Sequence, residues 1–258
     1  MTDGPLGGLK VLVTRPEDQA ERLCQLIKQK GGQVERLPVL RILPLTDRAG
    51  TFLAQAGGYD VMIFVSANAV HHALPGLPAP PWHTPPILAV GQATAEAIRS
   101  IGLPVAWTPQ ERFDSEALLA SPILMAVAGK RVLIVRGEGG RALLGHTLMA
   151  RGARVDEAEV YRRSLAAPIE SALLQQWHER VEVITATSND ILDGLLTLCG
   201  EAGRSRLLET PLVVISPRMA EHARRRGFQV IDQASQAGDA AILECLCTRW
   251  GIHTHSSC

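Results

Sequence analysis

The chain has 258 residues, and 46% of them are hydrophobic, which allows one large core or two of ordinary size. Its 26 basic and 26 acidic side chains cancel, so the overall charge gives no sign of a nucleic-acid or anionic-membrane partner. No apolar run approaches the roughly 18 residues that span a bilayer, and the start, "MTDGPLGGLK", lacks a signal-peptide profile. We therefore expect a globular, cytoplasmic protein, monomeric by default.

The cysteines and histidines give no pattern of a metal site. Five scattered cysteines indicate reduced thiols rather than a disulfide framework, and Cys245 and Cys247 lie in an apolar stretch typical of packing. The tail carries His253, His255 and Cys258, beyond the last periodic segment, where a frayed end is expected. The histidine pair that follows "FVSANAV" is expected on a solvated face. We expect no metal.

In chain order, short Val/Ile/Leu runs alternate with amphipathic helical patterns. The first half predicts strands at 11–14, 61–65 and 87–90, with helices at 17–30 and 93–101. The second half predicts strands at 132–135, 182–186 and 212–215, with helices at 139–151 and 218–226. This alternation is typical of parallel sheets covered on both faces, so the fold class is doubly wound α/β.

The two halves repeat one another. Aligning Val11 with Val132 also brings Arg15 opposite Arg136, and "YDVMIFVSANAV" lies beside "VEVITATSNDIL". The repeat alone suggests a boundary near Gly129. A second domain division is also possible, because "PVLRILPL" and "EVYRRSLAAP" occupy equivalent places in the two halves. Both segments are typical of extended connectors between domains. Periodicity does not decide between the two divisions.

Polar and small residues follow the predicted strands. In doubly wound sheets ligands bind outside the carboxyl ends of strands, and helix caps there leave N–H groups that hold carboxylates or phosphates. An arginine ending the first strand of each half could hold a carboxylate or form a structural salt bridge with Glu17 or Glu138. The candidates for binding an anionic ligand are Arg15, Ser66, Thr94, Arg136, Gly137, Ser188, Asn189, Ser216 and Pro217.

The usual cofactor and catalytic motifs are missing. The glycine-rich "VRGEGGR" lacks both the dinucleotide-binding spacing and the GK[ST] of a phosphate loop, so no cofactor is expected. No nucleophile elbow is found either. What remains is an asymmetry: Tyr161, one of two tyrosines, stands opposite Leu40. Its phenol either packs in the core with its hydroxyl satisfied or serves as a proton donor in a cleft.

The sequence resembles the uroporphyrinogen-III synthase family over essentially its whole length. The likeness rests on an ordered set of segments: "VLVTRPE", "FVSANAV", "AVGQATAEAIRSIG", "DSEALL", "KRVLIVRGEGGR", "ARVDEAEVYRR" and "TSNDILDGLL". The family implies two similar doubly wound α/β domains joined by a two-stranded linker, with a cleft between them. Domain 1 is then 1–37 plus 168–258, domain 2 is 46–158, and the linker strands are 38–45 and 159–167.

The resemblance also implies a reaction. The substrate is hydroxymethylbilane, a linear tetrapyrrole with eight carboxylates. The family converts it to uroporphyrinogen III in haem biosynthesis, losing water and inverting ring D through a spiro intermediate, with no cofactor or metal. Tyr161 would protonate the departing hydroxyl, because a tyrosine with an ordinary pKa near 10 is protonated at neutral pH. Transient hand-over from hydroxymethylbilane synthase is a further expectation.

The family pattern also assigns binding residues. It implies Ser66 and Thr94 as side chains lining the site, with the helix starts at Ser188, Asn189 and Ser216 holding carboxylates. Relatives often have threonine where this chain has Met219, so the neighbouring Arg218 would take over that contact here. The alternative function is a non-catalytic, two-lobed module that binds or senses a tetrapyrrole.

Overall fold

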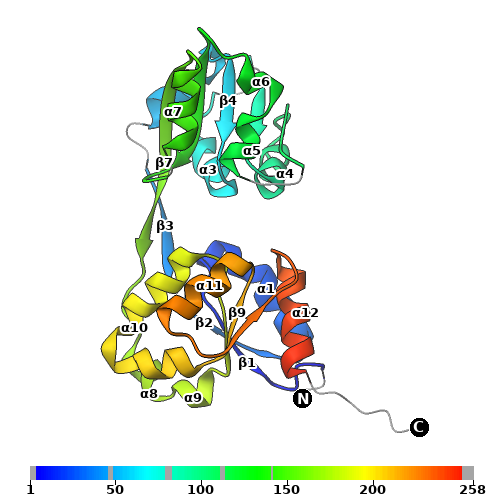
Figure 1. Cartoon of the computed structure of the whole chain (residues 1–258), viewed down its shortest axis with the longest axis vertical. Coiled ribbons are helices and arrows are strands. Elements are labelled where there is room, and N and C mark those ends of the chain that lie inside the picture. Colours follow the sequence, from blue (N-terminus) through cyan, green and yellow to red (C-terminus); the bar gives the residue numbers. More distant parts are fainter. Residues whose placement is uncertain (1–3, 46–48, 79–82, 111–113, 141, 252–258) are drawn as a thin grey trace, which may run out of the picture. The chain divides into compact units, whose positions relative to one another are not determined.

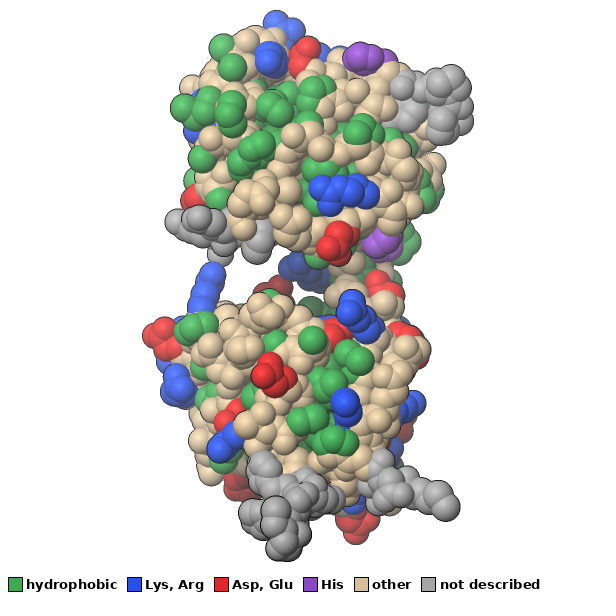
Figure 2. Space-filling model, turned by 90° about the vertical axis from the view of Figure 1, so that its right-hand side faces the viewer, with side chains coloured by type: hydrophobic (Ala, Val, Ile, Leu, Met, Phe, Trp, Pro, Cys, Tyr) green, Lys and Arg blue, Asp and Glu red, His purple; other side chains and the backbone are tan. Residues whose placement is uncertain are grey.

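The structure, a computed structural model, describes residues 4–45, 49–78, 83–110, 114–140 and 142–251 (Figure 1). The chain divides into two compact units. Unit 1 comprises Met1–Arg41 and Ser164–Cys258, and unit 2 comprises Ile42–Arg163. Within the described ranges, no helix is long and apolar enough to cross a membrane. On the face drawn in Figure 2, acidic and basic side chains are interspersed rather than gathered by sign.

Unit 1 is built on a five-stranded sheet in the order β10-β9-β8-β1-β2, with each neighbouring pair parallel. Its strands are β1 Lys10–Val13, β2 Gln33–Arg36, β8 Val183–Thr185, β9 Leu212–Val214 and β10 Ile231–Gln233. Its helices are α1 Glu17–Gln29, α8 Ser171–Gln175, α9 Trp177–Arg180, α10 Asn189–Glu209, α11 Pro217–Arg226 and α12 Asp239–Trp250. Figure 1 shows α1 and α12 together on one side of this sheet.

Helix α1 of unit 1 buries one stripe of side chains. In α1 the buried residues are Ala20, Leu23, Cys24 and Ile27, which follow the helical spacing of three, four and seven residues. This stripe packs with Val11 and Val13 of β1 in one of the two cores of the unit. Burial raises the pKa of the thiols of Cys245 and Cys247 in the same region, which disfavours reactive thiolates there.

Unit 2 contains a second five-stranded sheet, in the order β3-β7-β6-β4-β5. Its strands are β3 Leu40–Pro44, β4 Val61–Phe64, β5 Ile87–Ala89, β6 Arg131–Gly137 and β7 Arg154–Leu165. Its helices are α2 Ala49–Ala54, α3 Ala67–Ala73, α4 Gln92–Ser100, α5 Ser115–Leu119, α6 Pro122–Met125 and α7 Leu143–Ala150, with 3-10 turns at Ala56–Gly58 and Leu74–Gly76. The β7-β6-β4-β5 part is parallel throughout.

The two sheets confirm the doubly wound class and share an equivalent row of four strands, while β10 and β3 are added at opposite edges. The order β2-β1-β8-β9 in unit 1 corresponds to β7-β6-β4-β5 in unit 2. Each half of the sequence repeat contributes to both units, because β6 and β7 join β4 and β5, which precede them in the chain. A boundary near Gly129 would cut through unit 2. Whether 38–45 and 159–167 form a separate linker stays a prediction; in the structure β3 lies beside β7.

One helix begins later than its pattern predicts. The helix expected from residue 139 begins at Leu143, the first residue of α7. Gly139 adopts a left-handed backbone, with φ of 71°, and the chain turns there before the helix starts. The glycine-rich segment that opens this stretch therefore serves as a turn after β6.

Tyr59, the other tyrosine of the chain besides Tyr161, lies in the core of unit 2. Its hydroxyl donates to Asp156 Oδ2 at 2.9 Å, and the guanidinium carbon of Arg131 lies 4.5 Å from its ring centroid. Burial and then the hydrogen bond to Asp156 raise the pKa of Tyr59 to about 12. The neutral phenol is thus favoured in the folded state, and this stabilisation is present below pH 10 and lost as the pH rises toward 12.

This environment can be tested by ultraviolet titration of the Tyr161→Phe variant, in which Tyr59 is the remaining tyrosine. We expect tyrosinate to form with a midpoint near pH 12 in the folded protein and near 10 in urea-unfolded protein. Circular dichroism over the same range would establish that the protein is still folded. A folded-state midpoint near 10 would show that the contact with Asp156 does not hold the phenol neutral.

Candidate active site

Parallel pairing brings the predicted residues of unit 2 to one edge of its sheet. Phe64 is in register with Val135 on one side and Ala89 on the other. Two residues further on, the three strands have reached Ser66, Gly137 and Gly91. Gly137 is in turn in register with Tyr161 of β7. One row at the carboxyl edge therefore runs from Tyr161 through Gly137 and Ser66 to the start of α4.

A bulge in β7 determines which way Tyr161 faces. Arg136 is in register with Glu159 but the next residue, Gly137, is in register with Tyr161, so β7 carries one extra residue, Val160. Strand alternation alone would put Val160 and Tyr161 on opposite faces of the sheet. Because of the bulge, both side chains join Ala158 in the same core, which also contains Ala69 of α3. Tyr161 is thereby turned toward α3.

The hydroxyl of Tyr161 lies 3.1 Å from the Oγ of Ser66. Ser66 is the N-cap of α3, and its Oγ also accepts a hydrogen bond from the backbone N–H of Ala69 at 3.1 Å. Tyr161 is 2% exposed, whereas Ser66 is half-buried. The tyrosine is therefore held as a buried phenol with a satisfied hydroxyl, next to a serine that reaches solvent.

Two further residues fix the ring of Tyr161. A Cβ added at Gly137 would lie 2.5 Å from Cζ and 2.9 Å from the hydroxyl oxygen of Tyr161, so only glycine leaves room for the ring. On α3, the ring of His72 lies 5.7 Å from that of Tyr161, centroid to centroid, at an interplanar angle of 35°. The solvated face expected for the histidine pair is found at His71, which is exposed, whereas His72 is half-buried because its ring also contacts Tyr161.

Arg136 is engaged in an ion pair inside unit 2. Its Nη1 lies 3.0 Å from Glu157 Oε2, and its side chain is 6% exposed. Arg136 therefore forms a structural salt bridge, which is one of the two predictions for this residue. The predicted partner, Glu138, is wrong, because the partner is Glu157. The parallel register of β6 and β7 places Arg136 near Glu157, whereas Glu138 lies past the bulge.

Thr94, the third residue of α4, is 4% exposed and contributes to the burial of that helix. The cap of α4 is Gly91, which has no side chain to accept a hydrogen bond, so the first N–H groups of the helix are not covered by a cap side chain. In the structure Thr94 thus lies beneath the helix start rather than on its surface.

In unit 1 the predicted residues also follow adjacent strands. Arg15, after β1, forms an ion pair with Asp239, the first residue of α12, and both side chains are largely buried. The partner Glu17, which the sequence suggested, is therefore wrong. The acidic group comes instead from a helix near the carboxyl end of the chain, where it also suits the positive N-terminus of α12.

The two helices that follow β8 and β9 have serine caps. Ser188 Oγ accepts from Ile191 N at 3.2 Å at the start of α10, and Ser216 Oγ accepts from Met219 N at 3.3 Å at the start of α11. Pro217 and Arg218 are exposed at that start, while Met219 is 5% exposed and packs in the core. The side chain available to a ligand here is thus that of Arg218.

Asn189, the first residue of α10, presents an unusual polar atom. Its Oδ1 is buried and has no hydrogen-bond donor among the described residues. An unpaired buried acceptor costs roughly 1–3 kcal/mol, so this carbonyl oxygen is suited to receive an N–H donor from a ligand. Across the described ranges, no three His, Cys, Asp or Glu side chains are grouped as a metal site would require.

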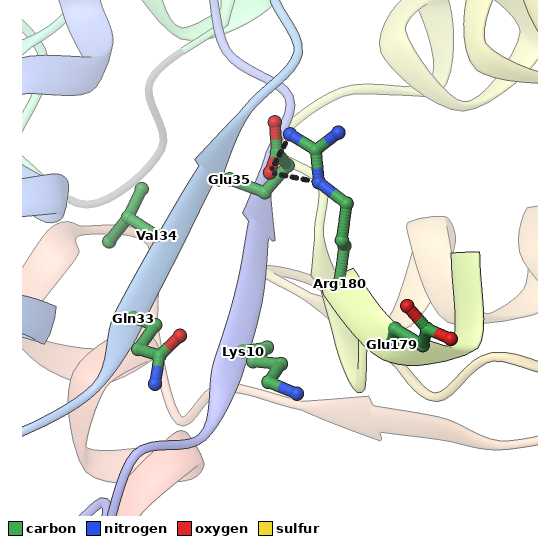
Figure 3. Close-up of a pocket in the computed structure, with 6 residues that line it drawn as sticks. All are labelled: Lys10, Gln33, Val34, Glu35, Glu179 and Arg180. Carbon is green, nitrogen blue, oxygen red and sulfur yellow. Dashed lines mark hydrogen bonds and ion pairs between the residues drawn. The ribbon is translucent and has the colours of Figure 1, made fainter. Parts of the chain in front are cut away.

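A pocket in unit 1 lies at the other end of the sheet. It has a volume of about 150 Å³ and is lined by Lys10, Gln33, Val34, Glu35, Glu179 and Arg180. Figure 3 shows Arg180 reaching Glu35, whose Oε2 accepts from Nη2 at 2.7 Å and from Nε at 3.1 Å. Lys10 and Gln33 are the first residues of β1 and β2, so the pocket lies away from the carboxyl edge. It is also smaller than the roughly 300–1,000 Å³ of typical ligand pockets.

A protein-family comparison agrees with this arrangement. The model described as "Uroporphyrinogen-III synthase HemD" matches residues 21–244, which covers both units. The chain belongs to the uroporphyrinogen-III synthase family. The match includes Tyr161, Ser66 and the helix starts of α10 and α11.

Relatives extend the similarity to whole proteins. The chain is 34% identical to the uroporphyrinogen-III synthase of Escherichia coli over 249 residues, covering 92% of this chain and 100% of that protein. It is 36% identical to the Salmonella typhimurium uroporphyrinogen-III synthase over 250 residues, with the same coverage of 92% and 100%. The family assignment therefore applies to the full two-unit chain.

Solved structures share the fold. The uroporphyrinogen-III synthetase of Helicobacter pylori superimposes with a TM-score of 0.63 at 16% identity, covering 92% of this chain and 97% of that one. A mutant uroporphyrinogen III synthase of Thermus thermophilus gives 0.60 at 16% identity, covering 92% and 96%. At this identity the likeness establishes the two-domain α/β fold of the family.

Removing the partner of Arg136 should destabilise the protein. In Glu157→Ala the nearly buried guanidinium keeps its charge and loses its carboxylate, and because Glu157 itself is 36% exposed we expect the free energy of unfolding to fall by about 2 kcal/mol. The matched control is Glu221→Ala, which breaks the exposed pair with Arg225 on α11 and should cost on the order of 0.5 kcal/mol. Urea denaturation measures both; equal small losses would mean that the Arg136 pair is no more than a surface pair.

Gly137→Ala should displace Tyr161. The added methyl group would overlap the phenol ring, and we expect a loss of about 1–3 kcal/mol in stability together with slower turnover. Gly50→Ala on α2 is the control, because a Cβ there meets nothing within 4 Å. Denaturation and steady-state kinetics are the measurements. Wild-type values for both in Gly137→Ala would show that the ring does not depend on this glycine.

Proposed function

We propose that this chain is a uroporphyrinogen-III synthase, a hydro-lyase that cyclises hydroxymethylbilane to uroporphyrinogen III. The observation that carries the proposal is the family match over both units, with relatives of that name aligned over their full length. The site supports it, since a buried tyrosine and several helix starts meet the needs of a reaction governed by positioning rather than by a cofactor. The product belongs to tetrapyrrole and haem biosynthesis.

Loss of the substrate hydroxyl is the step that needs an acid. The electron-rich pyrrole of ring A expels the hydroxyl as water and becomes an azafulvene, and a proton donor accelerates this by about 10²- to 10⁴-fold. Tyr161 is the proposed source of the proton. Ring D then attacks through its already substituted carbon, and the resulting spiro intermediate breaks and recloses with ring D reversed.

The remaining site residues are proposed to hold the carboxylates of the substrate. The starts of α4, α10 and α11 offer free backbone N–H groups at the positive ends of helix dipoles. Arg218 is exposed at the start of α11 and can pair with a carboxylate. Ser66, Thr94, Gly137, Ser188, Ser216 and Pro217 form the strand and helix ends that border the proposed site, and Asn189 would accept a pyrrole N–H. Arg15 and Arg136 would contribute by ordering the edge, because their guanidinium groups are already paired.

We also propose a setting for the reaction. A monomeric enzyme in the cytoplasm, which receives its unstable substrate directly from hydroxymethylbilane synthase, is part of this proposal. The competing candidate is a module that binds a tetrapyrrole without converting it.

The deciding assay adds purified protein to freshly generated hydroxymethylbilane, oxidises the products and separates porphyrin isomers I and III by chromatography. We expect isomer III to predominate, because the enzyme must outrun spontaneous closure, which occurs without inversion of ring D. Folded protein that yields isomer I at the spontaneous rate would identify a binding module. Heat-denatured protein is the control for the spontaneous reaction.

A further inference from the structure

The hydroxyl groups of Tyr161 and Ser66 differ in whether they can reach a substrate. The phenol is 2% exposed, and its ring is enclosed by Gly137 and His72. Ser66, in contrast, is half-buried at the carboxyl edge of the sheet. The group that holds the proton and the group that reaches a ligand are therefore two different residues in this conformation.

The direction of the hydrogen bond between them follows from counting donors. A serine hydroxyl has one proton and two acceptor sites, and one acceptor site of Ser66 already takes the N–H of Ala69. If Ser66 donated to Tyr161, the buried phenol O–H would need another acceptor, and an unpaired buried donor is costly. If Tyr161 donates to Ser66, both acceptor sites of Ser66 are filled and each buried donor is satisfied. The second arrangement is the stable one.

This arrangement leaves the proton of Ser66 unassigned. Both acceptor sites of its oxygen are used from within unit 2, so its O–H is the part of the group that can point outward. Donation from Tyr161 polarises the serine hydroxyl and makes it a better donor than an isolated serine. The Tyr161 O–H then donates to Ser66 Oγ, and the Ser66 O–H can donate to an oxygen of the ligand.

We propose that Ser66 is the catalytic residue that protonates the leaving hydroxyl of the substrate, and that Tyr161 is a positioning residue that supplies the replacement proton. This rests on the proposed synthase function. The Ser66 proton moves to the hydroxyl oxygen, the C–O bond breaks with its electron pair going to the departing water, and the pyrrole becomes a cationic azafulvene. The Tyr161 proton moves to Ser66 Oγ and leaves a phenolate. The proton that ring D releases when the macrocycle closes restores the phenol.

The bulge in β7 and the glycine at Gly137 support this assignment. The extra residue Val160 turns Tyr161 to the face of the sheet that carries α3, and Gly137 leaves the space that the phenol occupies. Each feature serves the contact with the cap of α3. A tyrosine that met the substrate directly would need neither enclosure nor a serine acceptor.

The test compares kcat and KM of Ser66→Ala, Tyr161→Phe and the double variant in the isomer assay. We expect each single variant to lose about 100-fold in kcat with little change in KM, and the double variant to lose no more than the slower single one. Ser66→Thr keeps a hydroxyl and should retain most of the activity. Ser66→Asn keeps an acceptor for the cap but has no hydroxyl, and should be as slow as Ser66→Ala.

A matched control separates catalysis from helix capping. Ser121 caps α6 in the same unit, with its Oγ accepting from Leu124 N at 3.2 Å, and Ser121→Ala should keep wild-type kcat. If Ser66→Ala or Ser66→Asn turns over at the wild-type rate while Tyr161→Phe is slow, Tyr161 acts directly and the relay is wrong. Losses that multiply in the double variant would also overturn it. Wild-type protein that yields only isomer I would instead overturn the proposed function, and the relay with it.

Discussion

The position of Tyr161 depends on one extra residue in a parallel strand. If β7 kept its residues but alternated regularly, without the bulge at Val160, Tyr161 would face the side of the sheet opposite to Ala158 and Val160, away from α3. The contact with Ser66, the ring contact with His72 and the need for glycine at position 137 all follow from the direction in which Tyr161 faces. A backbone irregularity of one residue thus determines which side chains can take part in chemistry at this edge.

The parallel register supplies the other half of the site. Because β7, β6, β4 and β5 run in the same direction, residues far apart in the chain end in one row. Short loops then lead directly into helices that start with serine caps or backbone N–H groups, and in unit 2 the serine cap of α3 lies beside the tyrosine. A substrate rich in carboxylates can be held by such groups without any large charged patch, which agrees with a chain of zero net charge.

Much of this could be predicted from the sequence. Apolar runs and helical spacing gave the doubly wound class, and the internal repeat gave the equivalence of Arg15 with Arg136 and of Ser66 with Ser188. The asymmetry between the halves singled out Tyr161. These features are local or repeat at a fixed spacing, which is why a single sequence reveals them.

The rest depends on contacts that no local pattern encodes. The partner of Arg15 lies 224 residues away, on a helix that sequence spacing cannot place against β1. The partner of Arg136 comes from the neighbouring strand, through a register that the bulge interrupts one residue later. The bulge itself has no signal in the residues of β7, so neither the burial of Tyr161 nor its hydrogen bond to Ser66 could be predicted.

The route of the chain has a consequence for how the protein is made. Unit 2 is one continuous segment, whereas unit 1 is assembled from the two ends of the chain. On the ribosome, β1, α1 and β2 emerge first, yet β8, the other neighbour of β1, is synthesised only after the whole of unit 2. The strand that lies between β2 and β8 must therefore wait with one side unpaired while unit 2 can already fold. Assembly of unit 1 then closes a long loop, and a folded insertion shortens the effective length of that loop.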